Sequence, residues 1–381
     1  MPEMLTPRQR MLAAYTGQPT DFVPVAPEFW YYLPASLLGL SMIEFELEVP
    51  HWQALQQTFR HYASEGWGIA APSVPSGLGG KVTTADRWSG ERQLVRTTEV
   101  NVDRQVLRSR QVFDQLEPSW MVERYIKDFD RDWPGYEKLS LVDPEELDWK
   151  PVQQALDAVG EDFLLEVYLG NAFVDYAGGQ REGGLQQVIL DLTDRPDEMA
   201  ALQVRYIDYL ARLTRAAFTH TTARSVFIGS IWSSLSLLSP ALWRRWDKPV
   251  LQAVVQAAHA CGGLVHHHFH GRCMGVLKDL AELGLDCICP FERPPGGDVI
   301  DLPGVARALA GRTAFNGNVH TVETLIRGTP ADVRREVLEI LEAFQGSSRL
   351  LIGTGDQVGS ETPEENIRTM IETARQYGKI T

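Results

Sequence analysis

Five histidines lie between His259 and His270, and two of them, His268 and His270, are spaced for joint chemistry. If this segment is extended, both side chains point the same way, ~6.6 Å apart along the strand. Two imidazoles at that spacing can bind one metal ion at ~2.0–2.1 Å each. Without a metal, the pair would serve as hydrogen-bonding groups or proton carriers. His266 shares the parity of His268, so it is either a third ligand or a packed core residue.

The histidines follow one of eight short apolar runs that we predict to be β-strands. The runs are aliphatic or β-branched with little alternation, as in strands buried on both faces of a parallel sheet. They are Val23–Val25, Trp67–Ile69, Phe163–Val167, Ser225–Ile228, Gly263–Val265, Cys287–Cys289, Thr313–Phe315 and Leu350–Ile352. Amphipathic helices are predicted between them, and several begin with a capping residue followed by proline. These pairs are Thr6-Pro7, Asp143-Pro144, Ser239-Pro240, Thr329-Pro330 and Thr362-Pro363.

Eight alternations of strand and helix favour a (β/α)8 TIM barrel over an open doubly wound sheet. No low-complexity tract or linker divides the chain, so residues 1–381 are predicted to form a single domain. Residues 81–113 instead alternate polar and apolar side chains, with turns at Ser89-Gly90 and Asn101–Asp103. We expect a small antiparallel β-hairpin insertion after the second strand. It would cover the C-terminal mouth of the barrel or form an interface.

The composition narrows the class of protein. A net charge of −14 argues against nucleic acid or an anionic membrane as partner. Met1 to Arg10 lacks the apolar run of a signal peptide, and no apolar stretch approaches the ~20 residues that cross a bilayer. Four cysteines in so long a chain are expected to be reduced thiols. Together these features predict a cytoplasmic protein that acts on small molecules.

Several segments resemble the uroporphyrinogen decarboxylase-like superfamily. They are RQRMLAAYTGQPTDFVPVAPEFW at the start, LSPALWRRWDKPVLQAVVQAAHACGGLVHHHFHG in the centre, and FNGNVHTVETLIRGTPADVRREV and LIGTGDQVGSETPEENIRTMIETARQYG near the end. The resemblance covers nearly the whole chain and implies a TIM barrel. The superfamily contains porphyrinogen decarboxylases and corrinoid:thiol methyltransferases.

The chain departs from the decarboxylase branch at the substrate loop. Those enzymes carry an arginine-rich loop after the first strand, whereas residues 27–32 read PEFWYY here. An acidic, aromatic loop cannot pair with a polycarboxylate. The histidine of the last strand in that branch is Thr354 in this chain. The resemblance is therefore closer to the methyltransferase branch.

The resemblance to the methyltransferase branch implies a metal site. Its zinc ligands fall on His268, His270 and Asp356, so that His270 and Asp356 replace two cysteines. Two histidines and one carboxylate suit Zn²⁺, or Fe²⁺, with open positions for substrate. We predict His268, His270 and Glu28 as the catalytic residues. Glu28 would act as a fourth ligand or a general base, or it would only cap a helix.

Other residues are expected to shape the pocket. Trp30, Tyr31 and Trp232 would give it aromatic walls for a cofactor, or they belong to the core or an interface. Asn318 follows the seventh strand and is a further cofactor-binding candidate. Cys287 and Cys289 share parity and are predicted to fill the barrel interior as small apolar groups.

The leading functional hypothesis is a metal-dependent methyl or one-carbon transferase of the corrinoid-dependent type. The corrinoid would be methyl donor or acceptor and could be carried by a partner corrinoid protein. One alternative is a decarboxylase-like lyase acting on a small acid or tetrapyrrole, with His268 or His270 as proton donor. The other is a non-catalytic barrel that binds a corrinoid. The resemblance to this family and the predicted insertion, which could form an interface, are compatible with a homodimer.

Overall fold

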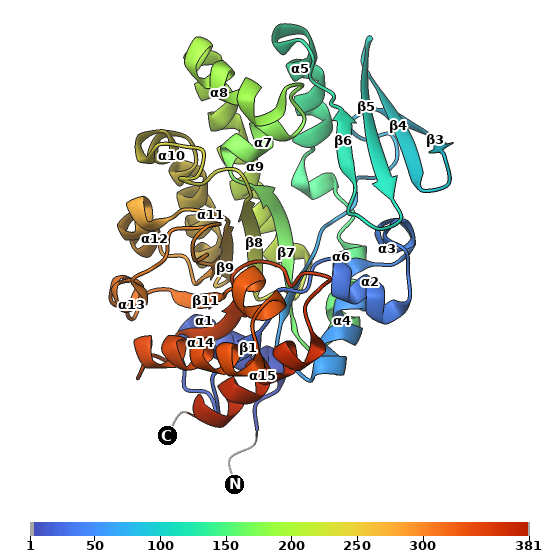
Figure 1. Ribbon diagram of the computed structural model, residues 1–381. Helices are drawn as coiled ribbons and strands as arrows, with labels where there is room; N and C mark the ends of the chain where they lie inside the picture. The colour runs from blue at the N-terminus through green and yellow to red at the C-terminus, as the bar shows by residue number, and fades with distance from the viewer. Residues whose placement is uncertain (1–3, 380–381) are drawn as a thin grey trace.

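The computed structural model describes residues 4–379 and contains an eight-stranded parallel sheet (Figure 1). All eight predicted strands are present, and most extend beyond the predicted apolar run. They are β1 (Val25–Ala26), β2 (Trp67–Ala70), β7 (Leu164–Asn171), β8 (Ser225–Ser230), β9 (Leu264–Phe269), β10 (Cys287–Pro290), β11 (Ala314–Val319) and β12 (Leu350–Thr354). Their hydrogen-bonded order is β1-β12-β11-β10-β9-β8-β7-β2. From β2 to β12 each strand of this sheet therefore pairs with the next one along the chain, whereas β1 pairs with β12.

The sheet curls around one interior, because a single apolar cluster takes a side chain from each of the eight strands. These side chains are Ala26, Trp67, Leu164, Phe227, Leu264, Cys287, Ala314 and Leu351. Helix α1 (Pro7–Thr16) adds Met11, Ala14 and Tyr15 to the same cluster, each fully buried. The N-terminal side of the interior is therefore filled by a helix.

The two ends of the sheet order, β1 and β2, are joined through a side chain. The carboxylate of Glu65, just before β2, accepts a hydrogen bond from the Val25 backbone N–H at 2.9 Å. Its other oxygen lies 2.6 Å from the Arg10 guanidinium of α1. Arg10 also binds Asp21, at 2.7 Å. A buried ion pair thus occupies the junction where a backbone ladder would otherwise close the sheet.

Helices pack around the outside of the sheet, and a second and larger apolar cluster lies between the two layers. They are α2 (Tyr32–Leu38), α3 (Met42–Glu48), α4 (His51–Tyr62), α5 (Phe129–Ser140), α6 (Lys150–Val159), α7 (Phe173–Gly179), α8 (Gly184–Asp194), α9 (Pro196–His220), α10 (Pro240–Trp246), α11 (Lys248–Ala260), α12 (Leu277–Glu282), α13 (Leu302–Leu309), α14 (Pro330–Ala343) and α15 (Glu364–Tyr377). Two short 3₁₀ helices, η1 (Pro144–Glu146) and η2 (Met274–Val276), and a π-helix, η3 (Thr321–Ile326), complete the set. None of the helices within residues 4–379 has the length and apolar character needed to cross a membrane.

The predicted capping residues account for some helix starts and not for others. The hydroxyls of Thr6, Ser239 and Thr329 accept backbone N–H groups at the starts of α1, α10 and α14, as predicted. The prediction for Thr362 is wrong, since α15 begins at Glu364 with no side-chain cap. Asp143-Pro144 opens a 3₁₀ turn rather than an α-helix.

The insertion after β2 is larger than the predicted hairpin over residues 81–113. It is a four-stranded antiparallel sheet of β3 (Lys81–Ser89), β4 (Gln93–Val102), β5 (Gln105–Asp114) and β6 (Trp120–Glu123), in that order. It stands apart from the main sheet, beside α3 and α5 (Figure 1). Apolar contacts hold it there: Leu94 and Phe113 pack with Ile43, and Leu107 packs with Tyr125 and Tyr136.

Candidate metal and active site

The histidine-rich strand β9 points alternate side chains into the interior, as its parity predicts. His266 is fully buried, and its ring packs edge-on against Trp67 and Phe227 of the interior cluster. His268 lies one step nearer the C-terminal edge and is 9% exposed. β9 ends at Phe269, so His270 lies just beyond the strand, yet the rings of His268 and His270 remain nearly parallel with centroids 6.3 Å apart. The pair therefore has the predicted spacing at the carboxyl end of the strand.

The structure brings the predicted His268, His270 and Asp356 together. One potential ligand atom from each lies within 4.8 Å of the others. His270 Nδ1 is 3.6 Å from Asp356 Oδ2 and 3.0 Å from Glu292 Oε2. Glu292 follows β10 and also accepts the backbone N–H of Gly271, so it binds both His270 and the residue after it. This second carboxylate was not predicted from the sequence.

Glu28 approaches the same site from the end of β1. Its Oε1 lies 3.7 Å from His268 Nδ1, and its backbone N–H donates to the Thr354 hydroxyl at 3.0 Å. The indole N–H of Trp30 donates to the Glu28 carboxylate. Glu28 is 4% exposed, so this carboxylate is fixed inside the strand ends rather than solvated.

Electrostatics distinguish the members of the site. Burial raises the pKa of the Glu28 carboxyl well above its usual value, and the charge of Asp356 adds to the shift. Burial likewise raises the pKa of Asp356, although His270 opposes it. Burial keeps the pKa of His268 well below its ordinary value, whereas the hydrogen bond to Glu292 raises the pKa of His270 in spite of burial. The site thus confines mutually repelling carboxyl groups beside a neutral imidazole, and a divalent cation would relieve that repulsion.

A buried polar network lies beneath the site. His266 Nδ1 is 2.8 Å from Glu166 Oε2 and 3.1 Å from the Tyr15 hydroxyl. Glu166 accepts a second hydrogen bond from the Ser225 hydroxyl at 2.7 Å. The carboxylate of Glu166 is fully buried and is satisfied by these partners.

The predicted aromatic walls occupy different places. Trp30 stacks on His51, with ring centroids 5.2 Å apart, and meets Trp67 edge-on. Tyr31 packs against Phe45 and His51 beside α3 and α4. Of the two, Trp30 is joined to the site, because it binds Glu28.

Trp232 and Asn318 are held by contacts within the protein. The backbone N–H of Trp232 donates to Asp175, and its ring lies near Gly178 of α7. The Asn318 amide is fully buried, donates to the Phe291 carbonyl at 2.7 Å and accepts from Arg293. The geometry gives these two residues structural partners, and their role toward a cofactor stays a prediction.

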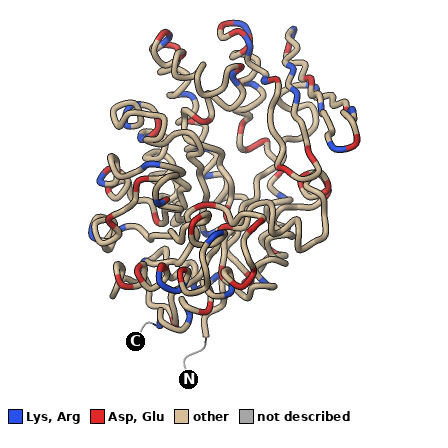
Figure 2. The backbone as a smooth tube through the Cα atoms, viewed as in Figure 1, with Lys and Arg blue, Asp and Glu red and all other residues tan. Residues whose placement is uncertain are grey.

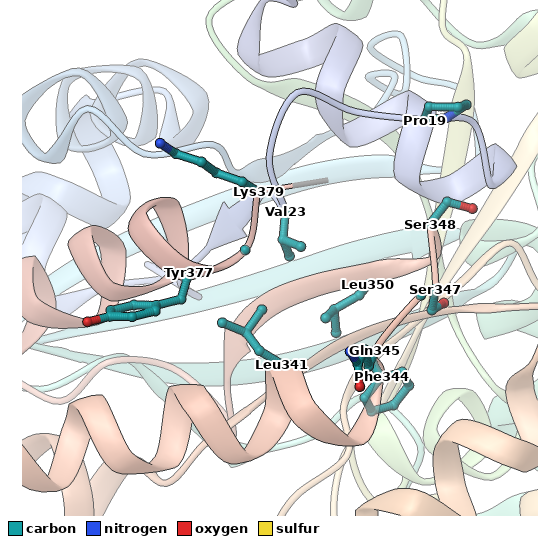
Figure 3. A pocket seen from close by; sticks show the side chains of 12 residues that line it. Pro19, Val23, Leu341, Phe344, Gln345, Ser347, Ser348, Leu350, Tyr377 and Lys379 are labelled. Atoms are coloured by element: carbon teal, nitrogen blue, oxygen red, sulfur yellow. The ribbon is translucent and has the colours of Figure 1, made fainter. Parts of the chain in front are cut away.

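A cavity of about 440 Å³ opens beside the site and is lined by Glu292, Arg293, His320 and Asp356 among others. Another cavity, of about 480 Å³, lies at the other end of the strands between α14 and α15 (Figure 3). It is lined by Val23, Leu341, Phe344, Leu350 and Tyr377. Of these two cavities, only the first is lined by carboxylates of the site, Glu292 and Asp356, so it is the candidate approach for a substrate.

Comparison with known proteins assigns the family. The profile of the uroporphyrinogen decarboxylase (URO-D) family matches residues 173–377, more than half of the chain. The chain belongs to the URO-D family. Two URO-D relatives, the uroporphyrinogen decarboxylases of two strains of Thermus thermophilus, are each 36% identical over 140 residues. That match covers 37% of this chain and 38% of each relative's length.

A solved methyltransferase from Methanosarcina mazei superposes with a TM-score of 0.65 and 16% sequence identity, over 98% of this chain and 99% of that one. At this identity the likeness supports the fold alone. The predicted superfamily is confirmed. The URO-D match includes β8 to β12 and therefore every predicted site residue except Glu28, Trp30 and Tyr31.

Proposed function

We propose that this URO-D family member is a metal-dependent methyl or one-carbon transferase of the corrinoid-dependent type. The observation that carries the proposal is the convergence of His268, His270 and Asp356, whose ligand atoms lie within 4.8 Å of one another beside a cavity. Two imidazoles and a carboxylate suit Zn²⁺, with Fe²⁺ as the other candidate. When bound, such an ion lowers the pKa of an acceptor group and holds it as a nucleophile.

The chain's own residues position and tune this site. His268 is kept neutral by burial, so a ring nitrogen is free to act as a ligand. Glu292 orients His270, as outer carboxylates commonly do for histidine ligands. Glu28, held by Trp30, is the fourth ligand or the general base of the site, and burial raises the pKa of its carboxyl well above the usual value.

The remaining expectations belong to the same proposal. The eight strands would close into a TIM barrel at the Glu65 junction, with residues 1–381 as one domain. A small-molecule substrate would enter beside Asp356, and a corrinoid would be presented by a separate corrinoid protein. Acidic and basic side chains are interspersed over the helices (Figure 2), and the net charge of −14 supports neither nucleic acid nor an anionic membrane as partner. A cytoplasmic location and a homodimer complete the proposal.

One alternative has a specific observation in its favour. The curated relatives are decarboxylases, and the raised pKa of His270 would suit a proton donor in a lyase acting on a small acid. Release of carbon dioxide by metal-free protein would favour this function. A non-catalytic corrinoid-binding barrel would instead show tight binding without turnover.

Metal analysis of purified protein tests the proposal directly. We expect about one Zn²⁺ or Fe²⁺ per chain, and single alanine substitutions of His268, His270 or Asp356 should weaken binding more than ~100-fold, since loss of an outer-shell partner alone costs ~10–100-fold. His259→Ala is the matched control, because this exposed histidine of the same stretch pairs only with Asp286 and should leave metal binding unchanged.

The activity test is demethylation of methylcobalamin, followed by its visible spectrum with a thiol or an oxygen acceptor. A protein that takes up no metal on reconstitution, or that leaves methylcobalamin intact with every acceptor class, would contradict the proposal.

A further inference from the structure

Cys289 lies directly beside His268 on the neighbouring strand. The two residues are register partners in the parallel pairing of β9 with β10. Cys289 Sγ is 3.4 Å from His268 Nδ1 and 3.2 Å from His266 Nε2, and the thiol is 2% exposed. A buried thiol between two imidazoles has a more polar setting than the interior packing role predicted from the sequence.

Glu28 brings an oxygen to the same nitrogen. Ligand atoms of Glu28, His268 and Cys289 all lie within 4.8 Å of one another. Around a tetrahedral zinc, an imidazole nitrogen and a thiolate sulfur are about 3.6 Å apart, and a nitrogen and a carboxylate oxygen about 3.3 Å. The 3.4 Å separation of Nδ1 and Sγ and the 3.7 Å separation of Nδ1 and Oε1 are close to these values. The three donors therefore need little rearrangement to share an ion.

We propose that Cys289 is a thiolate ligand of the metal, and that His268 Nδ1, Cys289 and Glu28 form an inner coordination set. This inference rests on the proposed function, because it requires that the chain binds a metal. A sulfur donor selects zinc or cobalt over magnesium, calcium or manganese.

The surrounding network fits a ligand role. Ligation releases the thiol proton of Cys289 to solvent as the metal ion takes its place. His266 Nε2 lies 3.2 Å from Sγ, and Nδ1 of the same ring lies 2.8 Å from Glu166 Oε2. His266 and Glu166 are thus positioning residues for Cys289.

Cys287 provides a matched comparison. It lies two residues earlier on β10, faces the same interior and is equally buried. It belongs to neither of the two groups of potential ligands found among residues 4–379. The two cysteines therefore share the same strand and the same degree of burial. Of the two, only Cys289 lies close to the ligand atoms of Glu28 and His268.

Reconstitution with Co²⁺ separates this inference from the proposed function. In the wild-type chain, visible d–d bands report metal binding, and a near-ultraviolet thiolate-to-cobalt charge-transfer band reports sulfur ligation. Cys289→Ser should lose the charge-transfer band and keep d–d absorption, whereas Cys287→Ser should keep both.

The other outcomes are decisive as well. Wild-type d–d bands without a charge-transfer band, or a charge-transfer band that survives in Cys289→Ser, overturn the thiolate assignment and leave the proposed function standing. A wild-type chain that binds no Co²⁺ overturns both. If Cys289→Ser does not fold, zinc-edge X-ray absorption of the wild-type protein decides, since a sulfur scatterer at ~2.3 Å is required and its absence refutes the assignment.

Discussion

Asp175 of α7 organises the loop that follows β8. Its carboxylate accepts the backbone N–H groups of Ile231, Trp232 and Ser233 at 3.1, 2.7 and 3.1 Å. Burial raises the pKa of this carboxyl, and the three hydrogen bonds oppose the shift. One side chain therefore fixes a turn at the same edge of the sheet as the candidate metal site.

Replacement of this carboxylate should loosen the loop. In Asp175→Ala the backbone N–H of fully buried Ser233 loses its acceptor, and we expect a loss of ~1–3 kcal/mol in the free energy of unfolding. Urea unfolding and faster hydrogen exchange of residues 231–233 measure the effect. Asp194→Ala, at an exposed helix end, should change neither. Equal effects of both substitutions would show that Asp175 has no special role.

At the scale of single residues, the sequence predicts some members of the site and misses others for a physical reason. The sequence predicts His268 and His270 because parity within one strand is visible in the chain. It does not predict Glu292 and Asp175, because each acts on the backbone of a segment brought near by the fold. It predicts only a packing role for Cys289, because the contact of this thiol with His268 depends on the register between two strands.

At the scale of elements, the insertion sheet also has a part that the sequence pattern predicts and a part that it does not. Alternation over residues 81–113 predicted an antiparallel hairpin, while β6 lies outside that range, is only four residues long and carries no clear period. Glu123 ends β6 and binds Arg108 and Arg110 of β5 at 2.9 and 2.7 Å, and Lys127 at 2.9 Å. The fourth strand is therefore attached by ion pairs that hydrophobic patterning does not reveal.

These ion pairs make the sheet sensitive to acid. Burial alone would raise the pKa of Glu123, but hydrogen bonds and charge from Lys127 and Arg108 lower it to about 2. The stabilisation is therefore present above the ordinary value of 4.5 and is lost as the pH falls toward about 2. Thermal unfolding should show Glu123→Gln destabilised near neutral pH, with the difference from wild type shrinking across that window. Glu91→Gln, in the exposed turn of the same sheet, should show no such pH-dependent difference.

At the scale of the whole molecule, the junction between β1 and β2 depends on Arg10 and Glu65, whose side chains are 5% and 1% exposed. Eight apolar runs suffice to predict a parallel sheet with helices outside it. They do not reveal that β1 contributes only Val25 and Ala26 to pairing, or that a carboxylate takes the Val25 N–H. The interaction that links β1 to β2 is a tertiary ion pair, and no local pattern encodes it.

Removal of Arg10 tests this junction. Arg10→Ala leaves Glu65 buried, with Arg375 3.8 Å away as its remaining cation, so we expect a loss of ~3 kcal/mol or more. Arg8→Ala on the same helix removes an exposed pair with Glu161 and should cost at most ~1 kcal/mol. Urea denaturation midpoints compare the two variants. Similar midpoints for both would contradict the importance of the buried pair.

Helix α1 has a consequence for turnover. Met11, Ala14 and Tyr15 fill the interior at the N-terminal ends of the strands. A substrate would therefore reach His268 from the C-terminal ends of the strands. Product would therefore leave by the same opening through which the next substrate enters. Substrate and product would exchange at one opening rather than pass through a channel.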